Sequence, residues 1–169
     1  MLPSRAPEQY LTFTLGQSLY AVQIAPIREI IEYPGLTEIP MTPAFLRGVI
    51  NLRGAVVPVI DLAVRFGRGQ TGVGRRTCIV ITEIGGDKGP LPLGILVDGV
   101  NEVLEVSAEQ VEDKPDFGLG LRPEFVRGMI RQQNRFIVML DIGHVLSVAE
   151  LEQLVEVETG AAAAAVTVG

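Results

Sequence analysis

The chain carries an internal repeat, and this repeat restricts the folds that it can adopt. Two stretches recur without a gap at an offset of 80 residues, and a third recurs at an offset of 73. The matched pairs are Pro43–Ile50 with Pro123–Ile130, Val57–Leu62 with Ile137–Ile142, and Tyr20–Glu32 with Leu93–Glu105. One supersecondary unit must bury an apolar face against a neighbour, so two copies predict two similar units that pack against each other.

Short apolar runs within the copies predict β-strands. Gly and Pro separate these runs about every ten residues, which is typical of a barrel or a sandwich. The apolar fraction is 47%, but only 5% of the residues are aromatic, so the core consists of Val, Ile and Leu, which suit pleated sheets. The predicted strands are Gln9–Leu15, Leu19–Ile24, Leu36–Ile39, Gly48–Leu52, Ala55–Asp61, Thr77–Glu83, Leu91–Val97, Val126–Arg131 and Phe136–Ile142.

Helix is predicted in two places only. Pro26 suits the first position of a short helical turn, which would carry Ile27, Ile30 and Ile31 on one face. Ser147–Val157 begins with capping-box spacing and continues with apolar residues at helical intervals, which predicts an amphipathic helix that closes the fold.

Charge and cysteine content exclude several classes of partner and site. The net charge is −6 and Lys and Arg form no long run, so nucleic acid is not the expected partner. A single cysteine, Cys78, excludes an internal disulfide and favours a reducing compartment such as the cytoplasm. No apolar run approaches the ~18 residues of a membrane span, so membrane insertion is not expected. One His and one Cys are too few for a clustered metal site, and no cofactor is predicted.

Two motifs imitate catalytic sites. Gly67–Gly72 fits G-x-G-x-x-G, but a strand follows it where a dinucleotide site needs a helix, so a mobile surface loop is expected. Asp61 and Asp141 are repeat counterparts, which resembles the paired carboxylates of a carboxylate hydrolase. Neither is followed by the Asp-Thr/Ser-Gly turn that brings such carboxylates together. We expect them to cap the turns that follow their strands. His144 lies too near Asp141 in sequence to suggest a hydrolase arrangement.

The two copies differ most at one turn. The first copy has Asn51–Gly54 where the second has Arg131–Asn134. Gly54 has a local reason, since a strand connection can need positive φ. The shared fold does not require Arg53, which is either an exposed hairpin charge or an arginine held by a carboxylate at an interface.

The segment Gly48–Leu62 reads G-V-I-N-L-R-G-x-x-x-P-V-I-D-L and, with its flanks, strongly resembles the CheW family of bacterial chemotaxis coupling proteins. The similarity spans about Gln9–Leu154. It implies a mainly β fold of two closely packed SH3-like five-stranded β-barrels with short helices and a C-terminal helix. The expected boundaries are one domain over 9–158, with units 15–83 and 84–146 and termini that cross between them, and a flexible Ala-rich tail over 159–169.

The resemblance also implies a function. Family members are non-enzymatic adaptors that couple methyl-accepting chemoreceptors to the CheA-type histidine kinase. A groove between the barrels takes the receptor's hairpin tip, and the matching residues here are Ile24, Ile27, Ile30 and Arg53. In the family the arginine pairs with a glutamate, which here is Glu29.

The kinase regulatory domain is expected at the first barrel. The matching residues are Leu36, Ile39 and Gly48. Gly48 keeps a glycine counterpart in Gly128, so backbone geometry alone could explain it. The implied location is the cytoplasm, at receptor arrays on the inner membrane.

Three alternatives remain at this point. The chain could be a CheW paralogue that serves a type IV pilus or another chemosensory pathway, or a hydrolase that uses Asp61 and Asp141. A regulatory fragment of a larger kinase is disfavoured, because the chain lacks kinase nucleotide motifs.

Overall fold

The computed structural model describes residues 7–86, 89–113, 121 and 123–145, which form eleven strands and four short helical segments. The strands are β1 (Glu8–Leu15), β2 (Ser18–Gln23), β3 (Ile27–Glu32), β4 (Leu46–Leu52), β5 (Ala55–Asp61), β6 (Cys78–Gly86), β7 (Gly89–Val97), β8 (Gly99–Val106), β9 (Val111–Glu112), β10 (Val126–Gln132) and β11 (Arg135–Leu140). The helical segments are α1 (Leu62–Arg65), η1 (Ala108–Gln110), η2 (Pro123–Phe125) and α2 (Ile142–Val145).

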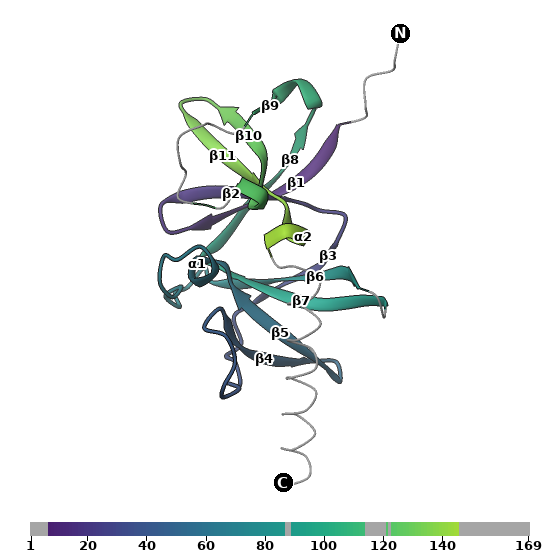
Figure 1. The fold of residues 1–169 in the computed structure, drawn as a ribbon, viewed down its shortest axis with the longest axis vertical. Helices are drawn as coiled ribbons and strands as arrows, with labels where there is room; N and C mark the ends of the chain where they lie inside the picture. Colours follow the sequence, from purple (N-terminus) through teal and green to yellow (C-terminus); the bar gives the residue numbers. More distant parts are fainter. Residues whose placement is uncertain (1–6, 87–88, 114–120, 122, 146–169) are drawn as a thin grey trace, which may run out of the picture.

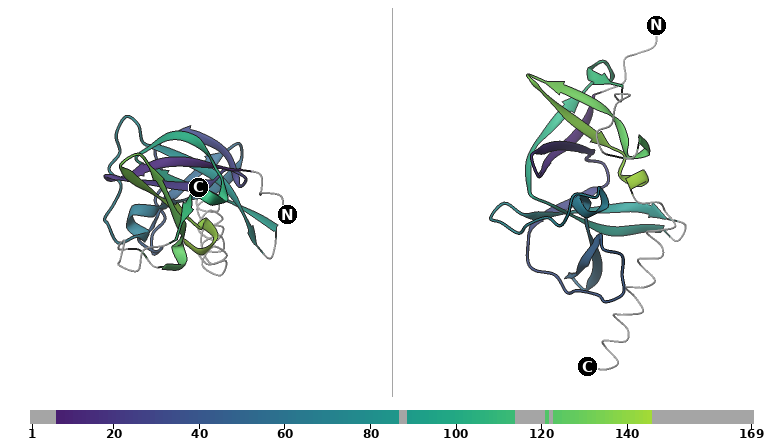
Figure 2. Two further views of the ribbon diagram at one scale, coloured as in Figure 1. Left: turned by 90° about the horizontal axis from the view of Figure 1, so that it is seen from above. Right: turned by 60° about the vertical axis from the view of Figure 1, so that its left-hand side comes forward.

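The strands form two sheets, one above the other in Figure 1 and distinct in the turned views of Figure 2. The five-stranded sheet has the order β3-β6-β7-β5-β4, and the six-stranded sheet has the order β8-β1-β2-β11-β10-β9. The predicted mainly β fold of two related units is therefore confirmed. The expected count of five strands holds for one sheet, and the two-residue strand β9 adds a sixth to the other.

The two copies of the repeat exchange a strand. β2 precedes β3 in the chain but pairs in parallel with β11, and β7 pairs in parallel with β5 in the corresponding way. The registers agree with the repeat, because Ala21 lies opposite Met139 and its counterpart Gly94 lies opposite Val59. Each sheet therefore contains strands from both halves of the sequence.

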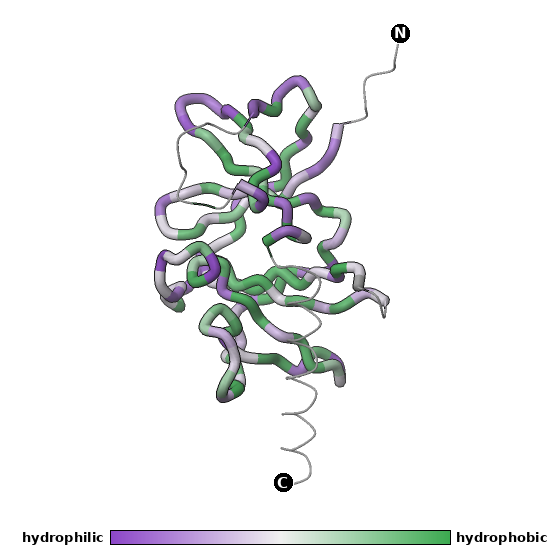
Figure 3. Tube along the Cα trace, in the orientation of Figure 1, coloured by the Kyte–Doolittle hydropathy of each residue, from purple (hydrophilic) through white to green (hydrophobic). Residues whose placement is uncertain are grey.

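Three apolar clusters hold the sheets together. One belongs to the five-stranded sheet and includes Val59 and Ile79, and one belongs to the six-stranded sheet and includes Ala21 and Met139. The third cluster, which we call the inter-sheet core, contains side chains of both sheets, among them Phe13 of the six-stranded sheet. Alternate residues of a strand point to opposite faces, so a strand between two cores must be apolar on both. Figure 3 shows this as long hydrophobic stretches along the strands.

Several predicted elements need correction. The helical turn after Pro26 is wrong, because Ile27–Glu32 is the strand β3, which pairs with β6. The predicted strand Leu36–Ile39 is reduced to one bridge between Thr37 and Val49. The strand β8 was not predicted at all. The predicted helix Ser147–Val157 and the tail 159–169 lie outside the described residues.

Candidate functional site

Gly48 and Gly128 allow the chain to pass close to β4 and β10. A Cβ on Gly48 would lie 2.6 Å from the carbonyl oxygen of Thr37, and one on Gly128 would lie 2.7 Å from Cγ1 of Val111. No side chain fits at the first distance without a backbone shift. The repeat therefore keeps glycine here for a packing reason, and this reason applies to both sheets.

The turn between β4 and β5 has an unusual backbone. Arg53 and Gly54 have φ values of 51° and 85°, the pattern of a type I′ hairpin turn. Asn51 supports the turn, since its Oδ1 accepts a hydrogen bond of 3.0 Å from the Gly54 amide. Gln133, the counterpart of Arg53, has a φ of 56°. The fold thus demands positive φ at this position, and arginine is a poor choice for it. Its side chain, not its backbone, explains why Arg53 is there.

The Arg53 guanidinium binds the Glu29 carboxylate with two nitrogens. Glu29 belongs to β3 and Arg53 follows β4, which are the two edge strands of the five-stranded sheet, so the sheet curls until its edges approach. The hydrogen bond from Arg53 lowers the pKa of Glu29, and the same bond raises the pKa of Arg53. The Arg53 side chain is 72% exposed, so the pair lies at the surface and its guanidinium is open to a partner.

Three isoleucines border the inter-sheet core beside this pair. A bulge between Ile27 and Glu29 shifts the register of β3, which pairs Ile27 with Thr82 and Ile30 with Val80. Thr82 and Val80 point to the same face, so Ile27 and Ile30 do as well. Ile24 and Ile27 pack against the inter-sheet core, and Ile30 is 44% exposed. We call Ile24, Ile27 and Ile30 the β3 strip, in which the first two residues pack against the inter-sheet core and Ile30 is exposed on the same face as Ile27.

The six-stranded sheet presents a matching border that the sequence interpretation missed. Val100 and Val103 of β8 are the repeat counterparts of Ile27 and Ile30. Val100 packs against the inter-sheet core, and Val103 is 51% exposed opposite Leu11, a member of that core. The offset of 73 would have identified both residues. We call Val100 and Val103 the β8 strip.

Leu36 and Ile39 lie half-buried in the connection between β3 and β4. Leu36 packs against the core of the five-stranded sheet, and its Cβ lies 3.0 Å from the ideal Cβ position of Gly48. Ile39 is held by its carbonyl, which accepts a hydrogen bond of 2.9 Å from the Thr42 hydroxyl. An open pocket at this connection is lined by Leu36 and by Asn51 next to the Arg53 turn. The structure thus brings Leu36 and Gly48 together on the five-stranded sheet.

Asp61 is fully buried and its carboxylate is saturated. It accepts hydrogen bonds from Ala63 N at 3.0 Å, Arg47 Nη1 at 2.8 Å, and the amide and hydroxyl of Thr71, both at 2.8 Å. The expected capping role is confirmed, since the bond from Ala63 caps α1. A carboxylate that solvent does not reach cannot attack a substrate, so Asp61 does not support hydrolase chemistry.

The loop Gly67–Gly72 is held by this carboxylate. Thr71 is buried and gives both of its donors to Asp61, so the expected mobile surface loop is fixed at this residue. Asp141, the counterpart of Asp61, is partly exposed, accepts a hydrogen bond of 3.2 Å from the amide of His144, and lies 2.8 Å from Nδ1 of the same residue. It caps a turn as expected.

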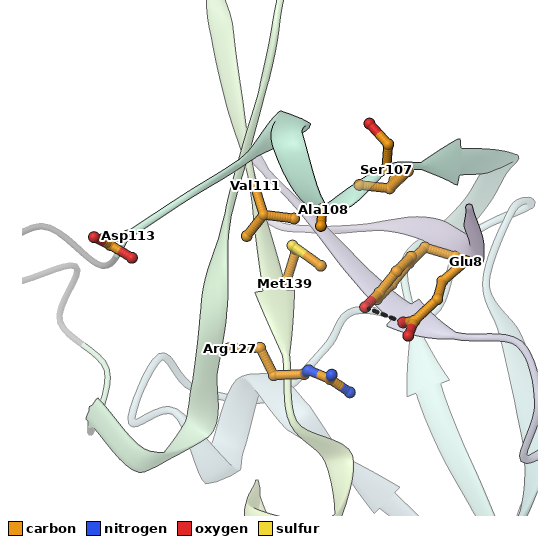
Figure 4. Close-up of a pocket in the computed structure, with 9 residues that line it drawn as sticks. Glu8, Ser107, Ala108, Val111, Asp113, Arg127 and Met139 are labelled. Atoms are coloured by element: carbon orange, nitrogen blue, oxygen red, sulfur yellow. Dashed lines mark hydrogen bonds between the residues drawn. The ribbon is translucent and has the colours of Figure 1, made fainter. Parts of the chain in front are cut away.

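A pocket at the six-stranded sheet contains none of the predicted site residues (Figure 4). Arg127, the counterpart of Arg47, extends into it instead of into a buried ion pair. The Tyr10 hydroxyl donates a hydrogen bond of 3.0 Å to Glu8, and burial raises the pKa of Tyr10.

Cys78 is a buried free cysteine. Burial raises the pKa of the Cys78 thiol, which keeps it protonated and agrees with its interpretation as a small buried hydrophobe. Among these residues no three His, Cys, Asp or Glu side chains are grouped to hold a metal ion. None of the helices that the structure describes is long and apolar enough to span a bilayer.

The chain thus consists of two related sheets with a shared core, and each sheet has an exposed apolar side chain at an edge strand, Ile30 on β3 and Val103 on β8. The sequence model of the CheW-like domain matches residues 9–150, and the chain belongs to this family. It is 36% identical over 144 residues to Chemotaxis protein CheW of Klebsiella aerogenes, which covers 85% of this chain and 84% of that protein. It is 33% identical to Chemotaxis protein CheW of Treponema pallidum, with 86% of each chain covered.

A solved structure shows the same fold. The scaffolding protein TtCheW from Thermoanaerobacter tengcongensis superposes with a TM-score of 0.74 at 33% identity, over 85% of this chain and 90% of that one. The resemblance seen in the sequence is therefore confirmed, as is the mainly β architecture.

Proposed function

We propose that the chain is a non-enzymatic adaptor in chemotaxis that couples methyl-accepting chemoreceptors to a CheA-type histidine kinase. The observation that carries the proposal is the β3 strip beside an exposed arginine whose backbone position disfavours arginine. The names of the relatives, Chemotaxis protein CheW and a scaffolding protein, support the same function. Such an adaptor acts in the cytoplasm, at receptor arrays on the inner membrane.

The receptor tip binds at Ile24, Ile27, Ile30 and Arg53. An α-helical hairpin presents an apolar stripe, which needs apolar side chains that are exposed but anchored in a rigid core. Ile24 and Ile27 are anchored in the inter-sheet core and Ile30 projects into solvent, which meets both conditions. Glu29 orients Arg53 for a polar contact at the rim of this surface.

The regulatory domain of the kinase binds at Leu36, Ile39 and Gly48. Leu36 supplies apolar contact beside an open pocket, and Gly48 sets the position of the Leu36–Thr37 backbone. Receptor and kinase then occupy different surfaces of one small protein. Coupling between them must be a difference in contact free energy between two receptor states.

A reconstitution tests the proposal. Receptor fragments, the kinase and the chain are mixed, and receptor-dependent autophosphorylation of the kinase is measured together with pairwise binding. Ile30→Ser is expected to weaken receptor binding, and Leu36→Ser to weaken kinase binding. Phe136→Ser is the matched control for Ile30→Ser, since Phe136 is 47% exposed but lies outside both surfaces.

The proposal is wrong if the wild-type chain gives no receptor-dependent activation, or if Phe136→Ser lowers receptor binding as much as Ile30→Ser. Soluble hairpin tips from each receptor class, tested in the same assay, decide between the chemotaxis pathway and a pilus or other chemosensory pathway.

A further inference from the structure

Arg65, the last residue of α1, joins the two sheets through its contacts with Phe45, Phe125 and Val145. Its guanidinium carbon lies 5.1 Å from the ring centroid of Phe45 and 5.3 Å from that of Phe125. Its Nε donates a hydrogen bond of 2.8 Å to the carbonyl of Val145. A guanidinium between two aromatic faces gains from both by cation–π attraction, more so when it is partly shielded from water.

These contacts lie where the two copies of the repeat meet. Phe45 and Phe125 are counterparts at the offset of 80, and so are Arg65 and Val145. The Phe45 carbonyl accepts a hydrogen bond from the Asp61 amide at the end of β5, and the Phe125 carbonyl accepts one from the Asp141 amide directly after β11. Each phenylalanine is thus tied to a different sheet. The two copies differ at this position, because Val145 is fully buried in the inter-sheet core whereas Arg65 contacts both rings.

The residues after Arg65 continue the connection. The Phe66 ring lies 5.7 Å from Tyr20 and 6.0 Å from Phe125, and Arg68 donates to the Tyr20 hydroxyl. Tyr20 belongs to the six-stranded sheet, whereas α1 follows directly from β5 of the five-stranded sheet. This short segment therefore contacts the opposite sheet at several points.

We propose that Arg65 is a positioning residue that fixes the orientation of the two sheets and thereby the separation of the β3 and β8 strips. The inter-sheet core is apolar, and apolar attraction is not directional, so the directional contacts between the sheets contribute most to their relative orientation. A hydrogen bond and a cation between two rings have defined geometry and remove this freedom. The strips border the core from different sheets, so their spacing follows the sheet orientation.

A change in the orientation of the sheets should affect receptor binding but not kinase binding. A helical hairpin that contacts the β3 strip beside the inter-sheet core depends on the orientation of the sheets. Leu36, Ile39 and Gly48 all belong to the five-stranded sheet and its β3–β4 connection, so the kinase surface does not depend on it. This consequence for binding rests on the proposed function, whereas the orientation itself can be measured without a partner.

The first experiment measures the distance between spin labels on the two edge strands. Glu32 on β3 and Glu105 on β8 are exposed repeat counterparts, and Glu32→Cys and Glu105→Cys are introduced together with Cys78→Ala, because Cys78 lies opposite Glu32 in the β3–β6 register and could form a disulfide with the new cysteine. In Arg65→Met the distance distribution is expected to broaden or shift, because methionine keeps the length of the side chain but not its charge or its donor. Arg131→Met is the control, since Arg131 stacks on Phe136 at 5.1 Å within one sheet, and it should leave the distribution unchanged.

The second experiment measures receptor-tip and kinase binding in the same variants without labels. Arg65→Met is expected to weaken receptor binding roughly tenfold and to leave kinase binding unchanged. If Arg65→Met does not fold, Arg65→Lys replaces it, because lysine keeps the charge but lacks the planar fork that spans two rings. An unchanged distance distribution in the folded variant overturns the proposal. A changed distribution with no receptor binding even in the wild type supports it and contradicts the proposed function instead.

Discussion

The five-stranded and six-stranded sheets are built from the same repeat, and their differences separate what the fold needs from what the protein uses. Both keep a glycine at 48 and 128, a positive φ at 53 and 133, and a capping aspartate at 61 and 141. These shared features are demands of the backbone. The side chains at 53 and 133, and the partners of the two aspartates, differ. Residues that serve a partner are therefore expected where two equivalent backbone positions carry different side chains.

The largest expected difference between the sheets is at the aspartates. Asp61→Asn leaves Arg47 partly buried without its counter-ion, which costs about 3–5 kcal/mol of unfolding free energy. Asp141→Asn weakens only a partly exposed cap and costs about 1 kcal/mol or less. Urea unfolding of both variants measures the difference. Equal losses would contradict the distinction, and receptor and kinase binding by Asp141→Asn at the wild-type level would exclude a functional carboxylate pair.

The two glycines give the next largest effect. Gly48→Ala drives Cβ against the Thr37 carbonyl oxygen, a backbone atom that cannot rotate away, and should cost about 2–3 kcal/mol. Gly128→Ala meets a Val111 methyl group at 2.7 Å and the Glu112 carbonyl oxygen only at 3.0 Å, and without the positive φ of Gly48 it should cost about 1–2 kcal/mol. The same urea experiment compares them. A larger loss in Gly128→Ala would show that the neighbour of Gly128 is the more rigid one.

The sequence predicted most strands but missed β3, β8 and the two-residue β9, and for β3 the reason is physical. Isoleucines at 27, 30 and 31 have helical spacing, and Pro26 suits the start of a helix. In the structure the bulge at Arg28 inserts one residue, so residues 27 and 30 share a face even though strand residues three apart normally do not. A bulged strand thus imitates a helix in its pattern. The predicted shared face of Ile27, Ile30 and Ile31 is therefore correct for Ile27 and Ile30 only, because Ile31 packs against the core of the five-stranded sheet on the other face.

Other features depend on contacts that no local pattern contains. The anchoring of Thr71 by Asp61, ten residues earlier, depends on the path of the loop between them. The position of Arg65 between Phe45 and Phe125 depends on how the two copies pack. Repeat counterparts were visible in the sequence, but only the packing shows which of them meet.

Arg53 and Gln133 test whether the turn in the five-stranded sheet serves a partner. Arg53→Asn replaces the arginine by a residue that tolerates the positive φ of 51° at this position. The unfolding midpoint of the variant should therefore stay at or slightly above that of the wild type. Receptor-tip binding should fall roughly tenfold, because an exposed charged donor is lost. Gln133→Asn puts asparagine at the equivalent position of the other turn, and it should alter neither the unfolding midpoint nor receptor-tip binding. A lower midpoint in Arg53→Asn with unchanged receptor binding would make Arg53 structural.

The smallest expected effect is the pH dependence of the Glu29–Arg53 pair. The hydrogen bond from Arg53 lowers the pKa of Glu29 below its ordinary value of 4.5. A lowered folded-state pKa adds stability that is complete above the unfolded-state pKa and is lost as pH falls through the folded-state value. The unfolding free energy of the wild type relative to Glu29→Gln should therefore be constant near neutral pH and shrink below about pH 4.5. In the Arg53→Asn background this pH-dependent difference should disappear. Among the described contacts Arg53 is the only cation that binds the Glu29 carboxylate, so its removal leaves nothing to lower the pKa of Glu29. If the difference persists there, another group holds the Glu29 carboxylate, and the side chain of Arg53 is free to turn toward a receptor.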